Sequence, residues 1–568
     1  MKRFLTLFLL AGLAACDLFT GSDGDDEQRV PRVGDRLQLN VQFRENCTNP
    51  ILRGGRVVAV SQRLIVVADT SNPAPGFSDA DYQEFASTFD NLVWPVDTRT
   101  FGEPTDIDKN DRIIAFFTRA INELTAPTSN SFVSGLVYSR DLFPKKETGN
   151  FAACQSSNEA ELMYLMVPDP SRGGAFTHEN VKRSTVGVLA HEFQHVLNAG
   201  RRLYVQRAPQ NVWNEEVWLN EGLSHIAEEL VFYEASALSS RRNIDLNLLR
   251  STPTILNAVN AYQVQNLSRL INYYGNPEQN SPYDTDDDLA ARGAAWAFLR
   301  YAADRRDGDD RAFFNALVNS NVIGLANLRA ALGGSTDPIP WVRDWNVSVY
   351  TDDAVSGVDA RFTQPSWNFR SVLPALRSNQ FPLRVRPLTN GVSTGPITLN
   401  AGGAAYLRFA VAPGGRAEVR AGVGGAPATG SCPGGTQVSG LQVGQVFHSP
   451  AGAPQLLCVD GGASGGEFTL IPFYGSEASS ANIVVDFTAT GIQTVTGPPN
   501  PSLSPFDAPL VSFQGAPVYQ EDLRIERAVR ERERELGRLI RGGGATRSVS
   551  APAAQDPTRL SFSVVRTR

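Results

Sequence analysis

This chain of 568 residues lacks an excess of positive charge and, after its first fifteen residues, lacks any long apolar run. Asp and Glu number 59 against 52 Lys and Arg, which gives a formal net charge of −7. Nucleic acid is therefore not the expected partner, because a protein that binds phosphates needs a basic face. No stretch reaches the roughly 18 apolar residues that span a bilayer. The composition, 42% hydrophobic and 20% charged, permits packed cores and excludes global disorder.

The first fifteen residues have the features of a targeting segment. Lys2 and Arg3 are followed by an apolar run over residues 4–15, which is too short to cross a bilayer but suits a signal peptide. The run ends in Leu-Ala-Ala-Cys, which resembles a bacterial lipobox. We expect residues 1–15 to be removed, Cys16 to be lipidated and residues 16–35 to form an acidic tether; cleavage without lipidation is the alternative. This predicts a lipid-anchored protein of the bacterial cell envelope that faces the periplasm or the exterior.

Four cysteines remain once Cys16 is assigned to the lipobox. An even number in an exported chain indicates disulfides, and four cysteines allow three connectivities. The pairs Cys47–Cys154 and Cys432–Cys458 are favoured, because each then stays within one domain. Free buried thiols are the alternative.

The chain changes character along its length, and its length predicts about three or four domains. Residues 36–180 have β-branched runs typical of strands, at 56–60, 64–68, 113–118 and 161–167, and a helix over 79–91 capped by Ser78. Residues 181–376 have helical periodicity, at 186–197 with a stop at Gly200, and at 217–230, 289–305, 311–318 and 323–332.

The sequence after residue 376 is rich in turn residues. Residues 377–495 predict a β-sandwich, with strands at 397–399, 405–411, 417–421, 455–459, 467–472 and 483–487. Residues 496–568 predict a proline-rich linker, a charged, solvated helix over 519–541 and a flexible low-complexity tail.

A His-Glu-x-x-His motif occupies residues 191–195. On a helix, His191 and His195 lie one turn apart on one face, so both imidazoles can bind one Zn²⁺. Glu192 can then act as the general base for the attacking water. Five histidines in the chain make a chance match rare, on the order of 0.002 per chain.

A catalytic zinc needs a third protein ligand. The best candidate is Glu221, in the Asn-Glu-Gly of a second predicted helix. The nearby carboxylates, which we expect to be solvated or to orient the ligands, are Glu215, Glu216, Glu228 and Glu229.

These motifs, with Gly293 to Arg305 and Trp341-x-x-Asp-Trp345, resemble the hyicolysin-type family of the gluzincin clan of metallopeptidases, over roughly residues 55–375. The resemblance implies a thermolysin-like zincin catalytic domain over residues 36–376, of α+β class, followed by the all-β sandwich domain. It also implies one Zn²⁺, a strand at 161–167 that binds an extended peptide at the sheet edge, and a downstream Tyr or His that stabilises the oxyanion.

One position departs from the thermolysin-like pattern. An aspartate that orients a ligand histidine usually follows the ligand glutamate by four residues, and His225 stands there. A neutral His cannot replace that carboxylate, so the orienting group must come from elsewhere. Candidate oxyanion donors are His225, Tyr283 and Tyr274, with Tyr262 and Tyr273 also available, and the sequence does not choose among them.

An acidic loop at Asp106, Asp108 and Asn110 has the alternating oxygens of a calcium site. It lacks the glycine and the final glutamate of an EF-hand. A Ca²⁺ site and a plain acidic turn both stay open.

The residues together predict a zinc metalloendopeptidase acting on protein or peptide substrates. One alternative is a lipid-anchored binding or adhesion protein with a vestigial peptidase domain. Another is a zinc hydrolase that cleaves a different bond, because the metal chemistry is shared.

Overall fold

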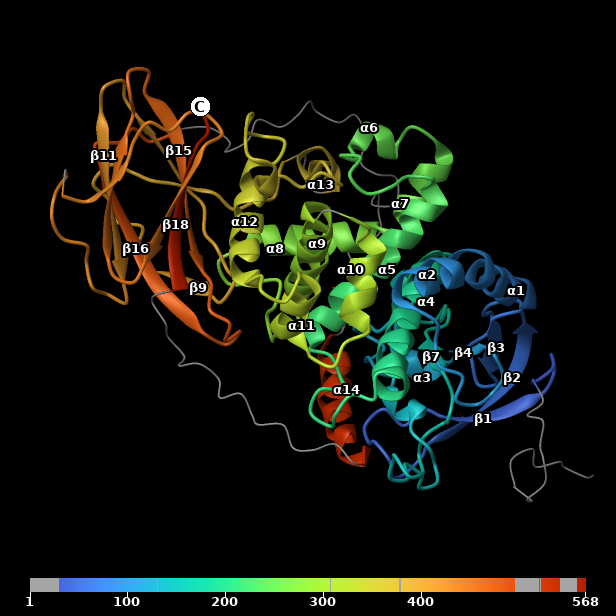
Figure 1. Cartoon of the computed structure of the whole chain (residues 1–568). Coiled ribbons are helices and arrows are strands. Elements are labelled where there is room, and N and C mark those ends of the chain that lie inside the picture. Colours follow the sequence, from blue (N-terminus) through green and yellow to red (C-terminus); the bar gives the residue numbers. More distant parts are fainter. Residues whose placement is uncertain are drawn as a thin grey trace, which may run out of the picture.

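The computed structural model describes residues 30–129, 131–306, 308–376, 380–432, 434–495, 520–521, 523–541 and 559–568. They form an N-terminal region (residues 30–376) and a β-rich domain (residues 380–495 and 559–568), shown in Figure 1. The predicted signal peptide, Cys16 and most of the acidic tether lie outside the described residues, as does the whole proline-rich linker (residues 496–518). No helix of the described chain combines the length and apolarity that crossing a membrane requires.

The N-terminal region contains a six-stranded sheet in the order β1-β2-β3-β4-β7-β6. Its strands are β1 (Arg36–Asn40), β2 (Leu52–Val60), β3 (Leu64–Asp69), β4 (Ile113–Phe117), β6 (Gly135–Val137) and β7 (Leu162–Leu165). β3, β4 and β7 are parallel, and β6 is antiparallel to β7. The prediction that residues 161–167 form the peptide-binding edge is wrong, because β7 lies between β4 and β6. The edge strand is β6, whose three residues are too few to show a strand pattern in the sequence.

The helices follow the predicted periodicity closely. They are α1 (Asp79–Thr88), α2 (Trp94–Phe101), α3 (Arg119–Asn122), α4 (His178–Gly200), α5 (Val217–Ser236), α6 (Leu246–Leu249), α7 (Pro253–Tyr262), α8 (Val264–Gly275), α9 (Leu289–Arg305), α10 (Asp310–Val318), α11 (Gly324–Ala331), α12 (Pro338–Thr351) and α13 (Phe369–Leu376). Ser78 caps α1 in a capping box with Asp81. Gly200 does not stop the chain's helical path, because a π-helical segment continues over Arg201–Val205.

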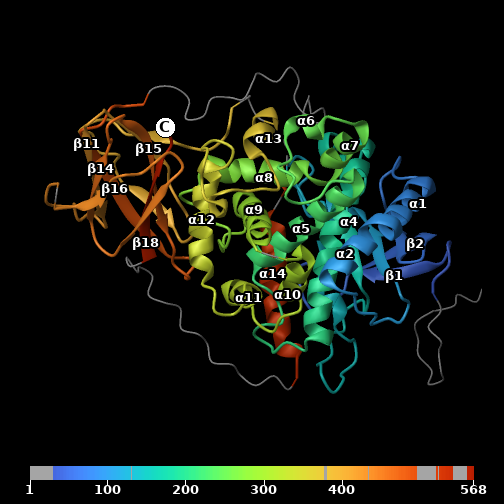
Figure 2. The ribbon, with the colours of Figure 1, turned by 45° about the horizontal axis from the view of Figure 1, so that its top comes forward.

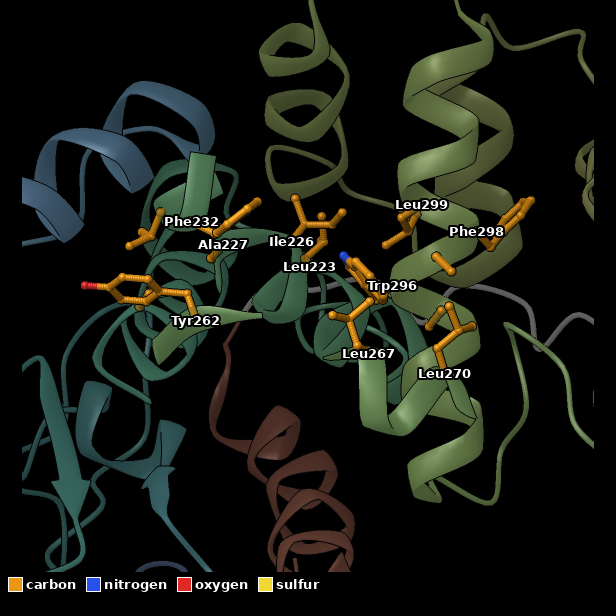
Figure 3. Close-up of a cluster of buried hydrophobic side chains, with 14 of the residues drawn as sticks. Leu223, Ile226, Ala227, Phe232, Tyr262, Leu267, Leu270, Trp296, Phe298 and Leu299 are labelled. Carbon is orange, nitrogen blue, oxygen red and sulfur yellow. The ribbon is translucent and has the colours of Figure 1, made fainter. Parts of the chain in front are cut away.

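Helix α5 lies at the centre of the helices and is buried on every face except at its C-terminal turn, where Glu234 is exposed. Its Leu223 and Ile226 pack in one apolar cluster with Trp296 of α9 and Leu267 of α8 (Figure 3). A Cβ at Gly222 would lie 2.8 Å from the Leu299 side chain, so glycine permits the close approach of α5 and α9. A helix that is buried all round holds its polar side chains in fixed positions, which matters for Glu221.

The β-rich domain has two five-stranded sheets, in the orders β13-β18-β15-β10-β8 and β12-β14-β11-β16-β9. Their bounds are β8 (Arg386–Pro387), β9 (Ile397–Asn400), β10 (Leu407–Val411), β11 (Arg416–Val423), β12 (Thr436–Val438), β13 (Val446–Ala451), β14 (Gln455–Asp460), β15 (Gly466–Tyr474), β16 (Asn482–Thr490) and β18 (Leu560–Arg566). Side chains from both sheets share one apolar core. Both predicted disulfides, Cys47–Cys154 and Cys432–Cys458, are confirmed, one in each region.

The C-terminal part of the chain differs from its prediction in two ways. Residues 560–566 are not part of a flexible tail, because β18 pairs with both β13 and β15. The charged helix, α14 (Leu523–Glu535), is not solvated, because Val529 and Glu533 are fully buried. Figures 1 and 2 show α14 against the N-terminal region and away from the strands of the β-rich domain. The chain therefore leaves the β-rich domain after β16, docks on the N-terminal region and returns as β18.

Candidate metal centre

Helix α4 carries the two histidines of the motif. Thr177 caps the helix by accepting a hydrogen bond from the Asn180 amide. His191 and His195 lie one turn apart, with their Nε2 atoms 3.2 Å from each other. Two ring nitrogens this close share a proton or a cation, and the spacing is that of two ligands on one metal ion.

Glu221 of α5 completes the group. Its Oε2 lies 3.4 Å from His191 Nε2, and its Oε1 lies 3.7 Å from His195 Nε2. Ligand atoms held tetrahedrally at the usual Zn–N and Zn–O lengths are about 3.4 Å apart. His191, His195 and Glu221 thus form a group able to hold a metal ion.

Unsatisfied polar atoms support this fit. Both carboxylate oxygens of Glu221 and Oε2 of Glu192 are buried without a hydrogen-bond partner among the described residues. Burying polar atoms without hydrogen bonds is costly, and a divalent cation would add to the ion pairs that Glu221 makes with Arg292 and Arg530. Burial favours the neutral form of Glu221, but Arg292 and the two histidines outweigh it and hold its pKa well below the usual value. Glu221 is therefore an anion and a suitable ligand.

Glu192 lies where a general base is expected. It is 5% exposed and follows His191 on α4. Burial raises the pKa of Glu192 to about 8, although the charges of His191 and Arg530 oppose the shift. A pKa near neutrality is what proton transfer to and from substrate requires. Strand β6 comes very close, since a Cβ at Gly135 would lie 2.7 Å from Glu192 Oε1.

The histidines are oriented by side chains of α5. Glu228 Oε1 lies 2.8 Å from His191 Nδ1, so Nδ1–H donates and Nε2 stays free for the metal. Asn220 Oδ1 holds His195 Nδ1 in the same way at 3.2 Å. Glu228 therefore supplies the carboxylate that the sequence lacks at position 225, one turn further along the helix. The sequence hinted at this only by placing Glu228 seven residues after Glu221, on the same helical face.

His225 lies beside His191, with ring centroids 4.8 Å apart, and its Nδ1 is 2.9 Å from Glu228 Oε1. Burial and the nearby charge of Arg269 lower the pKa of His225 to about 4. The ring is neutral at physiological pH, and its Nε2 is buried without a partner among the described residues. His225 stays a candidate for the oxyanion donor in the tautomer that carries its proton on Nε2, in which Nδ1 accepts from Arg269 Nη1 at 3.3 Å.

The two tyrosines predicted as donors lie elsewhere, and that prediction is corrected. Tyr283 donates its hydroxyl to the Ser476 carbonyl of the β-rich domain. Tyr274 packs its ring against Phe381, 5.3 Å between centroids. Both are core residues, and their sequence positions could not show it because each partner is about a hundred residues or more away.

Two arginines reach Glu221 that the sequence did not single out. Arg292 Nη1 of α9 lies 3.1 Å from Oε2, and Arg530 Nε of α14 lies 3.5 Å from Oε1. Neither belongs to a recognisable motif, and only packing of distant helices brings them to the ligand.

The candidate cation site at the acidic loop is formed by a different third residue than the sequence predicts. Asp106 and Asp108 come together with Glu161, and these three could hold a cation. Asn110 instead donates its amide to Asp108 Oδ2 at 2.6 Å. Burial raises the pKa of Asp108 to about 8 and of Glu161 to about 7. Calcium binding stays a prediction, with Glu161 in the place of Asn110.

A His-His-Glu group with an adjacent buried glutamate defines a metal-binding site of the metallopeptidase type. A comparison with curated proteins supports that class. Over 153 residues, 27% of this chain, the sequence is 28% identical to the neutral metalloprotease ShpI of Staphylococcus hyicus. The chain covers 31% of that protein's length. No family model matches the chain. The similarity and the site together support a metallopeptidase family and a metal-dependent peptidase.

Proposed function

We propose that this protein is a zinc-dependent endopeptidase of gluzincin type, with a thermolysin-like catalytic region over residues 36–376. The observation that carries the proposal is the convergence of His191, His195 and Glu221 beside the buried carboxylate of Glu192. When bound, Zn²⁺ would supply a Lewis acid that polarises the scissile carbonyl and makes water acidic enough to attack it.

The protein's own residues supply the rest of the chemistry. Glu228 and Asn220 fix the imidazoles so that both Nε2 atoms face one point. Glu192 accepts the proton of the attacking water and then gives it to the leaving amine, a role that its buried carboxylate next to the histidine ligands suits. Strand β6, the edge strand next to Glu192, is the place where an extended peptide would add as a further strand.

The test combines metal content with catalysis. Elemental analysis of the chain without residues 1–15 should find one zinc per chain, and cleavage of a peptide library should stop on adding a chelator. Glu192→Gln should keep the zinc and slow cleavage by about 10²–10⁴-fold. The matched control is Glu179→Gln, an exposed glutamate of the same helix, which should change neither quantity. A chain that holds no zinc would contradict the proposal.

We also propose that Cys16 is lipidated and anchors the protein in a bacterial cell envelope. The support is the lipobox-like sequence before Cys16. Cys16→Ala should move the protein from the membrane fraction to the soluble fraction of the producing cell. Membrane association that persists in this variant would contradict the anchor.

A further inference from the structure

The segment formed by β17 (Gln520–Glu521), α14 and a short 3-10 helix (Leu536–Leu539), called here the docked segment, lies along the edge of the sheet. β17 pairs in parallel with β5 (Ser131–Phe132), just before the edge strand β6. Arg530 Nη1 then donates to the Val137 carbonyl at 3.3 Å. Glu533 accepts a hydrogen bond from the Ser139 amide at 2.6 Å. These are backbone groups at the end of the edge, where an added peptide strand would need them.

The docked segment also reaches the helices on the other side of the metal centre. Arg292 of α9 forms an ion pair with Glu526 at 2.6 Å. Arg527 donates to the Asp287 carbonyl at 3.1 Å. Helix α14 therefore contacts both the sheet and the helices.

At the metal centre itself, Arg530 is 5% exposed and lies 3.5 Å from Glu221. Its charge also acts on Glu192. With the docked segment in place, Glu192, His195 and Glu221 are 5%, 3% and 0% exposed. A substrate carbonyl must approach these atoms, so an element that covers them has to move before a peptide can bind productively.

Apolar side chains hold the docked segment down. Val529 is buried in the cluster that includes Leu136 and Tyr138 of the sheet side. Leu536 and Ile540 pack against Trp213 in a separate cluster. The opposite face of α14, with Glu531 and Arg534, is exposed. This amphipathic docking is the pattern of a helix in a groove.

We propose that the docked segment is an inhibitor built into the chain: it occupies the peptide-binding edge and the metal centre, and the peptidase is latent until this segment is displaced. The inference rests on the proposed function and adds its regulation. Both ends of the segment are tied to the chain, which keeps its effective concentration on the order of millimolar. A modest intrinsic affinity therefore suffices for closure, and loss of a few contacts should open the site.

The test uses the full chain and separates access from catalysis. Val529→Asp places a charge in the apolar contact, and the matched control Arg534→Asp places the same residue on the exposed face of α14. Zinc content is measured first. Access is then measured as binding of a peptidyl hydroxamate, a zinc-directed probe, and turnover as cleavage of the peptide library. We expect Val529→Asp to bind the probe at least about tenfold more tightly than the parent chain and Arg534→Asp to match the parent.

A synthetic peptide of residues 520–541, added in excess, should reverse the gain, and the same peptide with Arg530→Ala should do so less well.

A second design avoids any folding defect of Val529→Asp. Recognition sequences for a specific protease, placed within 498–516 and within 544–556, allow the folded chain to be cut on both sides of the docked segment. After cutting, the segment is removed on a sizing column and probe binding is measured again. Tighter binding than before cutting supports the inference. Equal binding before and after removal of the segment overturns it. If the probe binds more tightly but no peptide is cleaved, the result supports the inhibitory role of the segment and contradicts the proposed peptidase function.

Discussion

The N-terminal region and the β-rich domain bury different kinds of side chain. In the N-terminal region, charged groups lie deep in the structure, among them the pairs Arg202–Glu215 and Arg292–Asp287, with all four side chains at most 3% exposed. In the described part of the β-rich domain, Arg408 is the one charged residue among the buried ones, and the core is otherwise built from alternating apolar residues.

The difference shows that the N-terminal region tolerates the energetic cost of burying charged side chains. Burying an ion pair gains little stability over an apolar pair, because both partners lose their water. Several of the buried charges lie on or beside α4 and α5, where Glu192, Glu215, Glu221, Glu228 and Glu229 are at most 6% exposed. Our expectation of solvated or ligand-orienting carboxylates was thus wrong for Glu215, which pairs with Arg202, and for Glu229, which accepts a hydrogen bond from Trp367, while Glu216 is exposed. Buried charges of this kind are typical of a functional site, whereas the described part of the β-rich domain buries almost none.

The strongest test of this contrast substitutes one histidine in each region. His195→Ala removes a ligand, and the zinc content should fall from about one per chain to near zero, with loss of peptide cleavage. His448→Ala removes a histidine of β13 whose Nδ1 contacts Ser563 Oγ at 2.7 Å, and it should leave both quantities unchanged. Elemental analysis and a cleavage assay measure the pair. Equal zinc loss in both variants would contradict the assignment of the metal site to the N-terminal region.

A core substitution in the β-rich domain should have the opposite profile. Phe562 of β18 is fully buried, and Phe562→Ala should lower the free energy of unfolding of this domain by about 3–5 kcal/mol. The exposed Val484 of β16 is the control, and Val484→Thr should stay within about 0.5 kcal/mol. Denaturant unfolding measures the change in stability of each variant, and elemental analysis measures its zinc content. A loss of zinc in folded Phe562→Ala would show that the two regions are coupled more tightly than their separate cores suggest.

The smallest effect concerns the orientation of a ligand. Glu228→Gln keeps the size of the side chain but removes the charge that orients His191, and zinc affinity should fall by about 10–100-fold. Glu234→Gln, on an exposed part of the same helix, is the matched control. Competition against a chelator of known affinity measures both variants. Unchanged affinity in Glu228→Gln would assign the orienting role to another group.

Local patterns predicted the elements well, and long-range packing accounts for what they missed. The Ser78 cap, helix α9 and strands β3 and β4 follow from residues close in sequence. The edge strand β6 was missed because three residues are too few to show the alternation of apolar and polar residues that predicts a strand. Strand β18 was missed because helix α14, which packs on the N-terminal region, lies between β16 and β18 in the sequence, so no local pattern links β18 to the domain that it completes.

The i, i+4 spacing of His191 and His195 was enough to predict from the sequence that both rings share one helical face, and the structure places them together. The sequence also favoured the cysteine pairing that the structure contains, because the four cysteines divide between two regions. Only the tertiary structure decided that Glu228 orients His191 and that Arg530, 309 positions after Glu221, lies against this ligand. Contacts of that kind depend on how helices pack, and no local periodicity encodes which distant side chain will fill a given space.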